Sequence, residues 1–125
     1  MNNSISLTPA EEKLAVIIWR NAPLSSPELV LITEQETGWK KSTTYTILKK
    51  LCDKGVFRNE NAQVTILLTR DELIAHQSRV FVEEAFGGSL PRFIASFIGN
   101  DRISPEQAEE IRKLIGNPER GDVSE

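Results

Sequence analysis

The sequence has few of the side chains on which most enzymes and metal sites depend. It contains one cysteine, Cys52, and one histidine, His76, in 125 residues. A single cysteine excludes a disulfide within the chain and favours a reducing compartment. The sequence also lacks a signal peptide and the ~18 consecutive apolar residues that a membrane span requires. We therefore expect a cytoplasmic protein with no direct membrane insertion.

Catalysis and cofactor binding are not expected either. A nucleophile needs a base within reach, and Cys52 and His76 fall on different predicted helices. Cys52 lies near the apolar side of its helix, which is typical of a core thiol. His76 has no second metal ligand at a suitable spacing, and no glycine-rich phosphate loop is present. The sequence thus predicts no enzymatic activity, no cofactor and no metal site.

Positive charge is scarce overall but concentrated in one short stretch. The formal net charge is −3. Between Lys40 and Arg58 there are six basic residues and one acid, Asp53, whereas the rest of the chain has nine bases and seventeen acids. An acidic protein that concentrates its bases on one helix offers a candidate face for a polyanion.

This basic helix has two distinct faces. At about 100° per residue, Thr44, Ile47, Leu48 and Leu51 share one side. Ser42, Thr46, Lys49 and Asp53 fall on the opposite side, Tyr45 and Lys50 flank it, and Thr43 lies at the border. Short hydroxyl side chains can reach base edges, and lysines on the flanks suit phosphates. A solvated surface helix is the alternative interpretation. The predicted DNA contacts are Lys40, Lys41, Ser42, Thr43, Tyr45, Thr46, Lys49, Lys50 and Arg58.

The order of elements predicts a winged helix-turn-helix domain over residues 1–68. Thr8-Pro9 starts a first helix that runs to about Asn21, Ser26-Pro27 starts a second that ends before Gly38, and the basic helix covers about residues 42–54. Leu24 is a candidate for a very short strand. Two β-branched and aromatic runs then flank the polar residues 59–63, which indicates a hairpin, or wing. The fold class is α+β, mainly α with a small β wing.

Residues 69–116 predict a three-helix dimerisation domain. A capping box starts at Thr69, a helix runs to about Phe86, an apolar piece covers 90–98, and Ser104-Pro105 starts the last helix. These short helices carry more apolar surface than one chain can bury, which favours a homodimer over helices folded back on the core. Residues 117–125 are polar and predict a flexible tail. The predicted dimer contacts are Leu73, Val80, Phe81, Phe86, Phe93, Ile94, Phe97, Ile111 and Leu114.

These features resemble a known family. The stretch TPAEEKLAVIIW, the motif WKKSTTYTILKKLCDKG, a wing of matching length and a final SPEQ-x-x-EIRKLI are similar to the penicillinase-repressor family of bacterial regulators. The resemblance implies a homodimeric transcriptional repressor that binds a dyad-symmetric operator with two half-sites. By position, it implies that the operator is contacted by Lys41, Ser42, Thr43 and Thr46. A winged protein-interaction module without specific DNA binding remains the second candidate.

The resemblance also bears on how repression ends. Antibiotic-responsive members are cut between asparagine and phenylalanine downstream of a membrane sensor-protease system, and the matching bond here is Ser96-Phe97, where serine replaces the asparagine. Copper-responsive members bind Cu(I) through C-terminal cysteines. This chain has no cysteine after Cys52, so the copper route is not expected.

Overall fold

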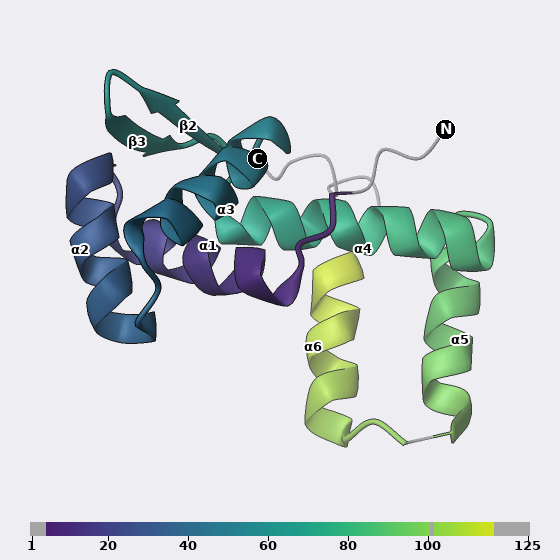
Figure 1. Ribbon diagram of the computed structural model, residues 1–125. Helices are drawn as coiled ribbons and strands as arrows, with labels where there is room; N and C mark the ends of the chain where they lie inside the picture. Colours follow the sequence, from purple (N-terminus) through teal and green to yellow (C-terminus); the bar gives the residue numbers. More distant parts are fainter. Residues whose placement is uncertain (1–4, 101, 117–125) are drawn as a thin grey trace. The chain divides into compact units, whose positions relative to one another are not determined.

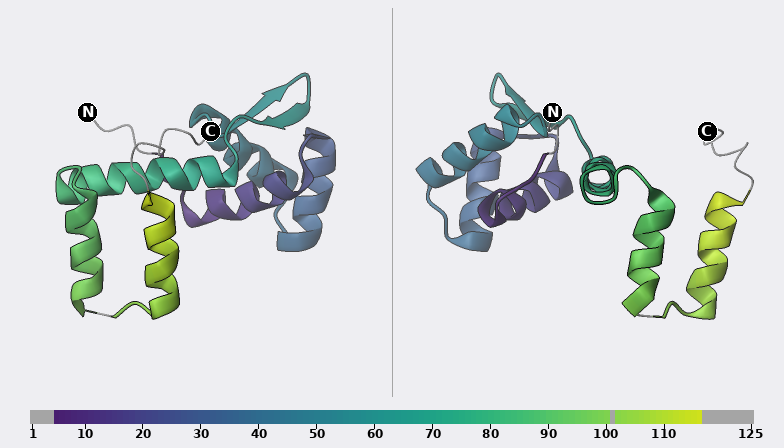
Figure 2. Two further views of the ribbon diagram at one scale, coloured as in Figure 1. Left: turned by 180° about the vertical axis from the view of Figure 1, so that it is seen from behind. Right: turned by 90° about the vertical axis from the view of Figure 1, so that its right-hand side faces the viewer.

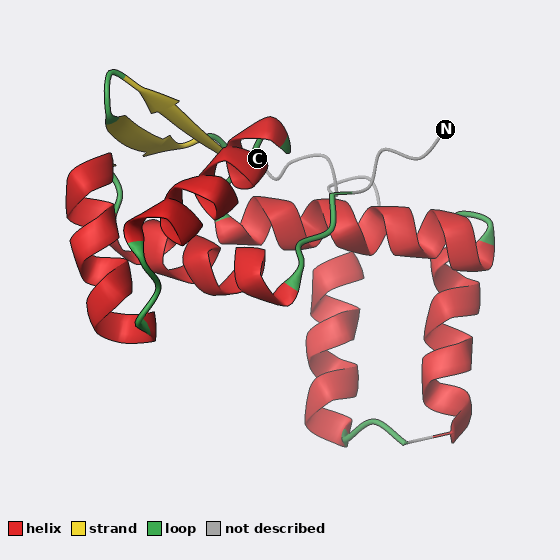
Figure 3. Ribbon diagram, viewed as in Figure 1, coloured by secondary structure: helices red, strands yellow, loops and turns green. Residues whose placement is uncertain are grey.

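Helices dominate the computed structural model, which describes residues 5–100 and 102–116 (Figures 1 and 3). The predicted α+β class is confirmed, and the predicted tail at 117–125 lies outside the described residues. No helix of the described part is long and apolar enough to cross a membrane. The elements in chain order are α1 (Pro9–Asn21), β1 (Leu24–Ser25), α2 (Ser26–Thr37), α3 (Lys41–Asp53), β2 (Phe57–Glu60), β3 (Gln63–Ile66), α4 (Arg70–Phe86), α5 (Leu90–Asn100) and α6 (Pro105–Ile115).

Side-chain caps fix where most of these helices begin. The Thr8 hydroxyl accepts the Glu11 amide at 3.1 Å, and the Glu11 carboxylate accepts the Thr8 amide at 2.9 Å. The same reciprocal pair of bonds starts α4 at Thr69. The cap of α2 is Ser25, so α2 begins at Ser26 itself. Each reciprocal pair satisfies two amides that the helix leaves unpaired, which explains why sequence alone locates these starts well.

The sheet has the order β1-β3-β2, with antiparallel pairs throughout. Leu24 pairs with Val64, so the predicted short strand is confirmed. The predicted five-residue connection at 59–63 is wrong in length. Residues 59, 60 and 63 belong to the strands, and the turn is Asn61-Ala62 alone, with φ of 53° and 61°. A two-residue turn with positive φ matches the twist of the strands, and it leaves more residues for pairing.

One apolar core holds α1, α2, α3 and the sheet together. Leu14 and Ile18 of α1, Leu48 of α3 and Val64 of β3 are among its buried members. Trp19 packs at the edge of this core, where its ring centroid lies 5.5 Å from that of Phe57. The Trp19 indole N–H donates a hydrogen bond to the carbonyl of Leu68 at 3.0 Å. This core fixes α3 relative to the wing.

The chain divides after Phe81 into two compact units. In the second unit, α5 and α6 run side by side in both views of Figure 2. The ring centroids of Phe86 and Phe93 are 5.6 Å apart, and those of Phe93 and Phe97 are 6.3 Å apart. None of the side chains described in α5 and α6 is buried. The described part of the second unit therefore lacks a closed core of its own.

The wing turn gives a stability prediction. Alanine in a left-handed conformation costs about 1–2 kcal/mol, whereas the extra freedom of glycine in the unfolded chain costs about 0.4–1 kcal/mol. We expect Ala62→Gly to raise the free energy of unfolding by up to about 1 kcal/mol, measured by urea denaturation at fixed protein concentration. Ala75→Gly, on an exposed part of α4, is the control and should lower it by about 1 kcal/mol. A loss of stability at Ala62 would contradict the strain argument.

Candidate nucleic-acid interface

The helix α3 is anchored by one face and exposes the other. Thr44, Leu48 and Leu51 are buried, and Ile47 is half-buried against the same core. Ser42, Thr43, Thr46 and Lys49 are exposed on the opposite side. The apolar face predicted from the sequence is therefore the buried face observed, whereas Tyr45, which was predicted to face outward, is half-buried against the core. Because the apolar side is held by the core, the hydroxyls and ammoniums are presented to solvent on a rigid element.

The exposed bases form two groups around these hydroxyls. Lys40 and Lys41 lie at the start of α3, and Lys49 and Lys50 lie toward its end. Lys49 is 3.4 Å from Asp53, but both side chains are largely exposed and such a pair is weak. Arg58 is exposed on β2. These cations are available to an anionic partner.

Lys54, in contrast, is used inside the fold. Its ammonium lies 2.6 Å from the Glu11 carboxylate and 2.7 Å from the carbonyl of Ser6, and only 33% of its side chain is exposed. The charge count of the basic stretch includes Lys54, but this ammonium neutralises a buried acid. The positive face of α3 is thus smaller than the sequence suggests.

Glu11 has the perturbed carboxyl group of this region. Burial raises its pKa, but the bonds from Lys54 and the Thr8 amide and the charges of Lys54 and Lys50 outweigh burial, so the net pKa is lowered. Only 4% of the Glu11 side chain is exposed. The carboxylate is therefore ionised at neutral pH and joins the start of α1 to the end of α3.

The start of α3 favours an anion. Lys40 occupies the cap position but provides no side-chain hydrogen bond, and Lys41 follows in the first turn. Cations at the positive end of a helix dipole are unfavourable on their own. A phosphate at this end would accept the unpaired amides and neutralise both lysines.

Tyr45 and Cys52 lie differently from the outward residues. Tyr45 is half-buried against the core, and its hydroxyl donates to the Ser26 hydroxyl at 3.3 Å. Cys52 is also half-buried, and burial, with the nearby Asp53 charge, raises the pKa of its thiol. A protonated thiol is a poor nucleophile and metal ligand. Among the residues described, no three His, Cys, Asp or Glu side chains group to hold a metal.

The wing offers little charge at its tip. The Asn61-Ala62 turn has no base, and Glu60 beside it is exposed. A groove of about 400 Å³ separates the wing from α3, with Leu48 and Cys52 among its lining residues and Asn59 on the wing side. Arg58 is therefore the one positively charged side chain between residues 57 and 66.

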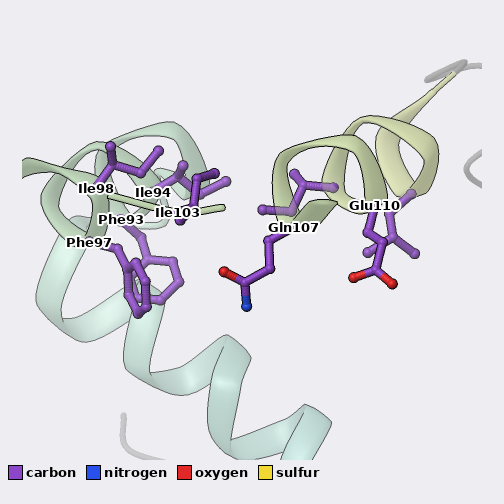
Figure 4. A pocket seen from close by; sticks show the side chains of 9 residues that line it. Phe93, Ile94, Phe97, Ile98, Ile103, Gln107 and Glu110 are labelled. Atoms are coloured by element: carbon purple, nitrogen blue, oxygen red, sulfur yellow. The ribbon is translucent and has the colours of Figure 1, made fainter. Parts of the chain in front are cut away.

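The predicted dimer residues gather mostly on the second unit. Phe93, Phe97 and Leu114 are among those that line a groove of about 310 Å³ between α5 and α6 (Figure 4). Ile98 and Ile103 line it too, although they are not among the predicted contacts. Ile98 follows Ile94 by four residues, a spacing that signals a shared helix face. Leu73 differs from the other predicted contacts, since it is 3% exposed and already buried within the first unit.

Comparison with known proteins decides the family. The family model described as penicillinase repressor matches residues 7–117, which is most of the chain. The chain belongs to the penicillinase-repressor family. It is therefore a transcriptional repressor and not an enzyme, as the sequence predicts.

Two relatives extend over nearly the whole chain. The penicillinase repressor of Bacillus licheniformis is 21% identical over 113 residues, which cover 87% of this chain and 88% of that protein. The methicillin resistance regulatory protein MecI of Staphylococcus epidermidis is 20% identical over 118 residues, which cover 91% of this chain and 96% of that protein. In this penicillinase-repressor family member, the Ser96-Phe97 bond lies within α5 and both side chains are exposed.

The Glu11 carboxylate gives a prediction for this family member. Glu11→Gln should lower the free energy of unfolding at pH 7 by about 1–3 kcal/mol, because Lys54 loses a charged partner. The folded-state pKa of Glu11 is below its ordinary value of 4.5, so its contribution is full above that value. The contribution is lost as the pH falls through the lower, folded-state pKa. The difference between parent and variant should therefore shrink at acid pH, measured by urea denaturation.

The neighbouring glutamate provides the control for this experiment. Glu12 is exposed, so Glu12→Gln should lower the free energy of unfolding at pH 7 much less than Glu11→Gln does. An equal loss in both variants would mean that total charge, and not the Lys54 pair, sets the effect.

Proposed function

We propose that this protein is a homodimeric, sequence-specific DNA-binding repressor that inserts α3 into the major groove of its operator. The observation that carries the proposal is the exposed face of α3, where Ser42, Thr43 and Thr46 are flanked by lysines while the opposite face is buried. A helix held by a core and exposed along one polar face fits the width of the major groove.

The residues of this face divide by chemistry. The hydroxyls of Ser42, Thr43 and Thr46 would contact base edges, and the threonine methyls can pack on thymine methyls. Lys40, Lys41, Lys49 and Lys50, with Arg58 from the wing, would contact phosphates, which contribute affinity and orientation but little sequence information. The capless start of α3 supports a phosphate contact at Lys40 and Lys41.

The dimer would form through the second unit. Phe97 is 60% exposed and Leu114 is 84% exposed, and exposed apolar groups of this size and density mark an interface. A two-fold dimer presents two copies of α3, which suits an operator with two half-sites. Phe86, Ile94 and Ile111 belong to this proposed interface as well. Val80 and Phe81, at the end of the first unit, are further proposed contacts.

A protein-interaction module is the alternative. It would need no exposed lysines at both ends of α3, and its binding to DNA would be weak and indifferent to sequence. A mobility shift with the DNA upstream of its own coding sequence, titrated with salt, separates the two functions.

Two variants of α3 test the role of its exposed face. Lys49→Ala should weaken binding to operator and non-operator DNA alike, and it should reduce the slope of log affinity against log salt by about 0.9 for each of the two subunits. Thr46→Ala should cost on the order of 1–3 kcal/mol on the operator at one base-pair position. Fluorescence anisotropy at several salt concentrations measures both effects.

A lysine away from α3 provides the control. Lys13 is exposed on α1, and Lys13→Ala should bind like the parent. If the Lys49 and Thr46 variants also bind like the parent, α3 is not the DNA-reading helix.

We extend the proposal to the release of the operator. A dimer holds two half-sites at high effective concentration, so weakening the dimer weakens binding without touching α3. Cleavage at Ser96-Phe97, by a membrane sensor-protease system or otherwise, would separate Phe97 and α6 from the rest of the chain. Each apolar Å² lost from the interface costs about 25 cal/mol.

A truncated chain tests this release mechanism. The full chain should sediment at about twice its mass of 14.0 kDa, whereas a chain that ends at Ala95 should sediment as a folded monomer and lose operator binding at physiological salt. Leu114→Glu changes one exposed side chain and should act in the same direction, with the exposed Lys113→Glu as its control. A truncated chain that stays dimeric and binds as tightly as the full chain would refute the mechanism.

A further inference from the structure

Two hydrogen bonds connect three elements of the first unit at Ser26. The Ser26 amide donates to the carbonyl of Ala62 in the wing turn at 2.8 Å. The Ser26 hydroxyl accepts the Tyr45 hydroxyl at 3.3 Å. Ser26 is the first residue of α2, Ala62 joins β2 to β3, and Tyr45 lies on α3. The wing turn is therefore linked to α3 through one residue, whose backbone amide bonds to the turn and whose hydroxyl bonds to Tyr45.

We propose that Tyr45 and Ser26 position the DNA-reading face of α3 relative to the wing, and that Tyr45 is a positioning residue and not a base contact. This inference rests on the proposed DNA-binding function. It assigns Tyr45 a different role from the outward residues Ser42, Thr43 and Thr46.

Burial supports this assignment. Ser26 is 4% exposed, so its hydroxyl cannot reach a bound DNA molecule. The ring of Tyr45 packs against the core, and its hydroxyl is directed to Ser26. A tyrosine that reads a base would present this hydroxyl to solvent.

The apolar anchor of α3 leaves a need for directional contacts. Leu48 and Leu51 hold the helix by non-directional burial, which tolerates small rotations. The buried hydroxyls of Thr33 on α2 and Thr44 on α3 have no hydrogen-bond partner within the described part of the chain. They add no direction to the contact between these helices. The Tyr45–Ser26 bond does so, because hydrogen bonds weaken steeply away from their preferred angles.

The wing side of the link is also fixed. Ser25 pairs with Gln63 in the sheet, and the bond from Ser26 to Ala62 continues this pairing by one residue into the turn. The wing is therefore held at its turn as well as along β3. Rotation of α3 would change its distance from Arg58 on β2, and both must meet the same DNA.

A double-mutant cycle tests the proposal. Tyr45→Phe and Ser26→Ala each remove one hydroxyl of the pair, and each should lower operator affinity by about three- to tenfold. The double variant should bind no more weakly than the weaker single variant, since both changes remove the same bond. Affinity for non-operator DNA and the salt slope should stay at the parent's values, because no phosphate contact is lost.

A set of operators with single base-pair changes separates positioning from base reading. The effect of Thr46→Ala should disappear when its own base pair is changed. The effect of Tyr45→Phe should persist on every operator of the set, because a displaced helix affects every base contact.

Three outcomes would overturn the inference. If Tyr45→Phe weakens binding and Ser26→Ala does not, Tyr45 contacts DNA directly. If the losses of operator affinity in the two single variants add in the double variant, the two hydroxyls act separately. If both variants lower the melting temperature but bind operator like the parent, the bond serves stability alone. If the parent protein does not bind the operator, the proposed function is refuted. If Lys49→Ala weakens operator binding but Tyr45→Phe and Ser26→Ala do not, only this inference is refuted.

Discussion

Burial of one side of α3 is the constraint on which the candidate site depends. Leu48 and Leu51 enter the same core as Leu14 and Ile18 of α1. Since a helix repeats every ~3.6 residues, fixing these side chains also fixes which side chains are exposed. Thr46 and Lys49 are presented outward because their neighbours in the sequence are buried.

A buried charge completes this arrangement at the far end of the helix. The Glu11 carboxylate caps α1 and accepts the Lys54 ammonium, which follows α3. Removing either partner would leave the other buried and unpaired, which is costly. The contact joins residues that are 43 positions apart. Local sequence patterns cannot reveal it, because Glu11 already has a complete role in its own capping box.

The limits of sequence reasoning follow the same distinction between local and distant effects. Helix starts at Thr8 and Thr69 and the two faces of α3 are local properties, and they were predictable. The two-residue wing turn was not, because Asn61-Ala62 lacks the glycine that usually signals it. The burial of Leu73 and the link from Tyr45 to Ser26 depend on tertiary packing. Whether any α3 side chain contacts a base is a question of binding, and no pattern in the chain answers it.

The two units have different sources of stability, and this difference bears on regulation. The first unit has a closed core of buried side chains, whereas α5 and α6 have no buried side chain among the residues described. In the proposed dimer, a second chain would supply the missing burial, so the order of α5 and α6 would depend on protein concentration. Operator affinity would then be linked to dimerisation by mass action. In this proposal, any event that removes apolar surface from α5 or α6 would weaken repression while α3 stays intact.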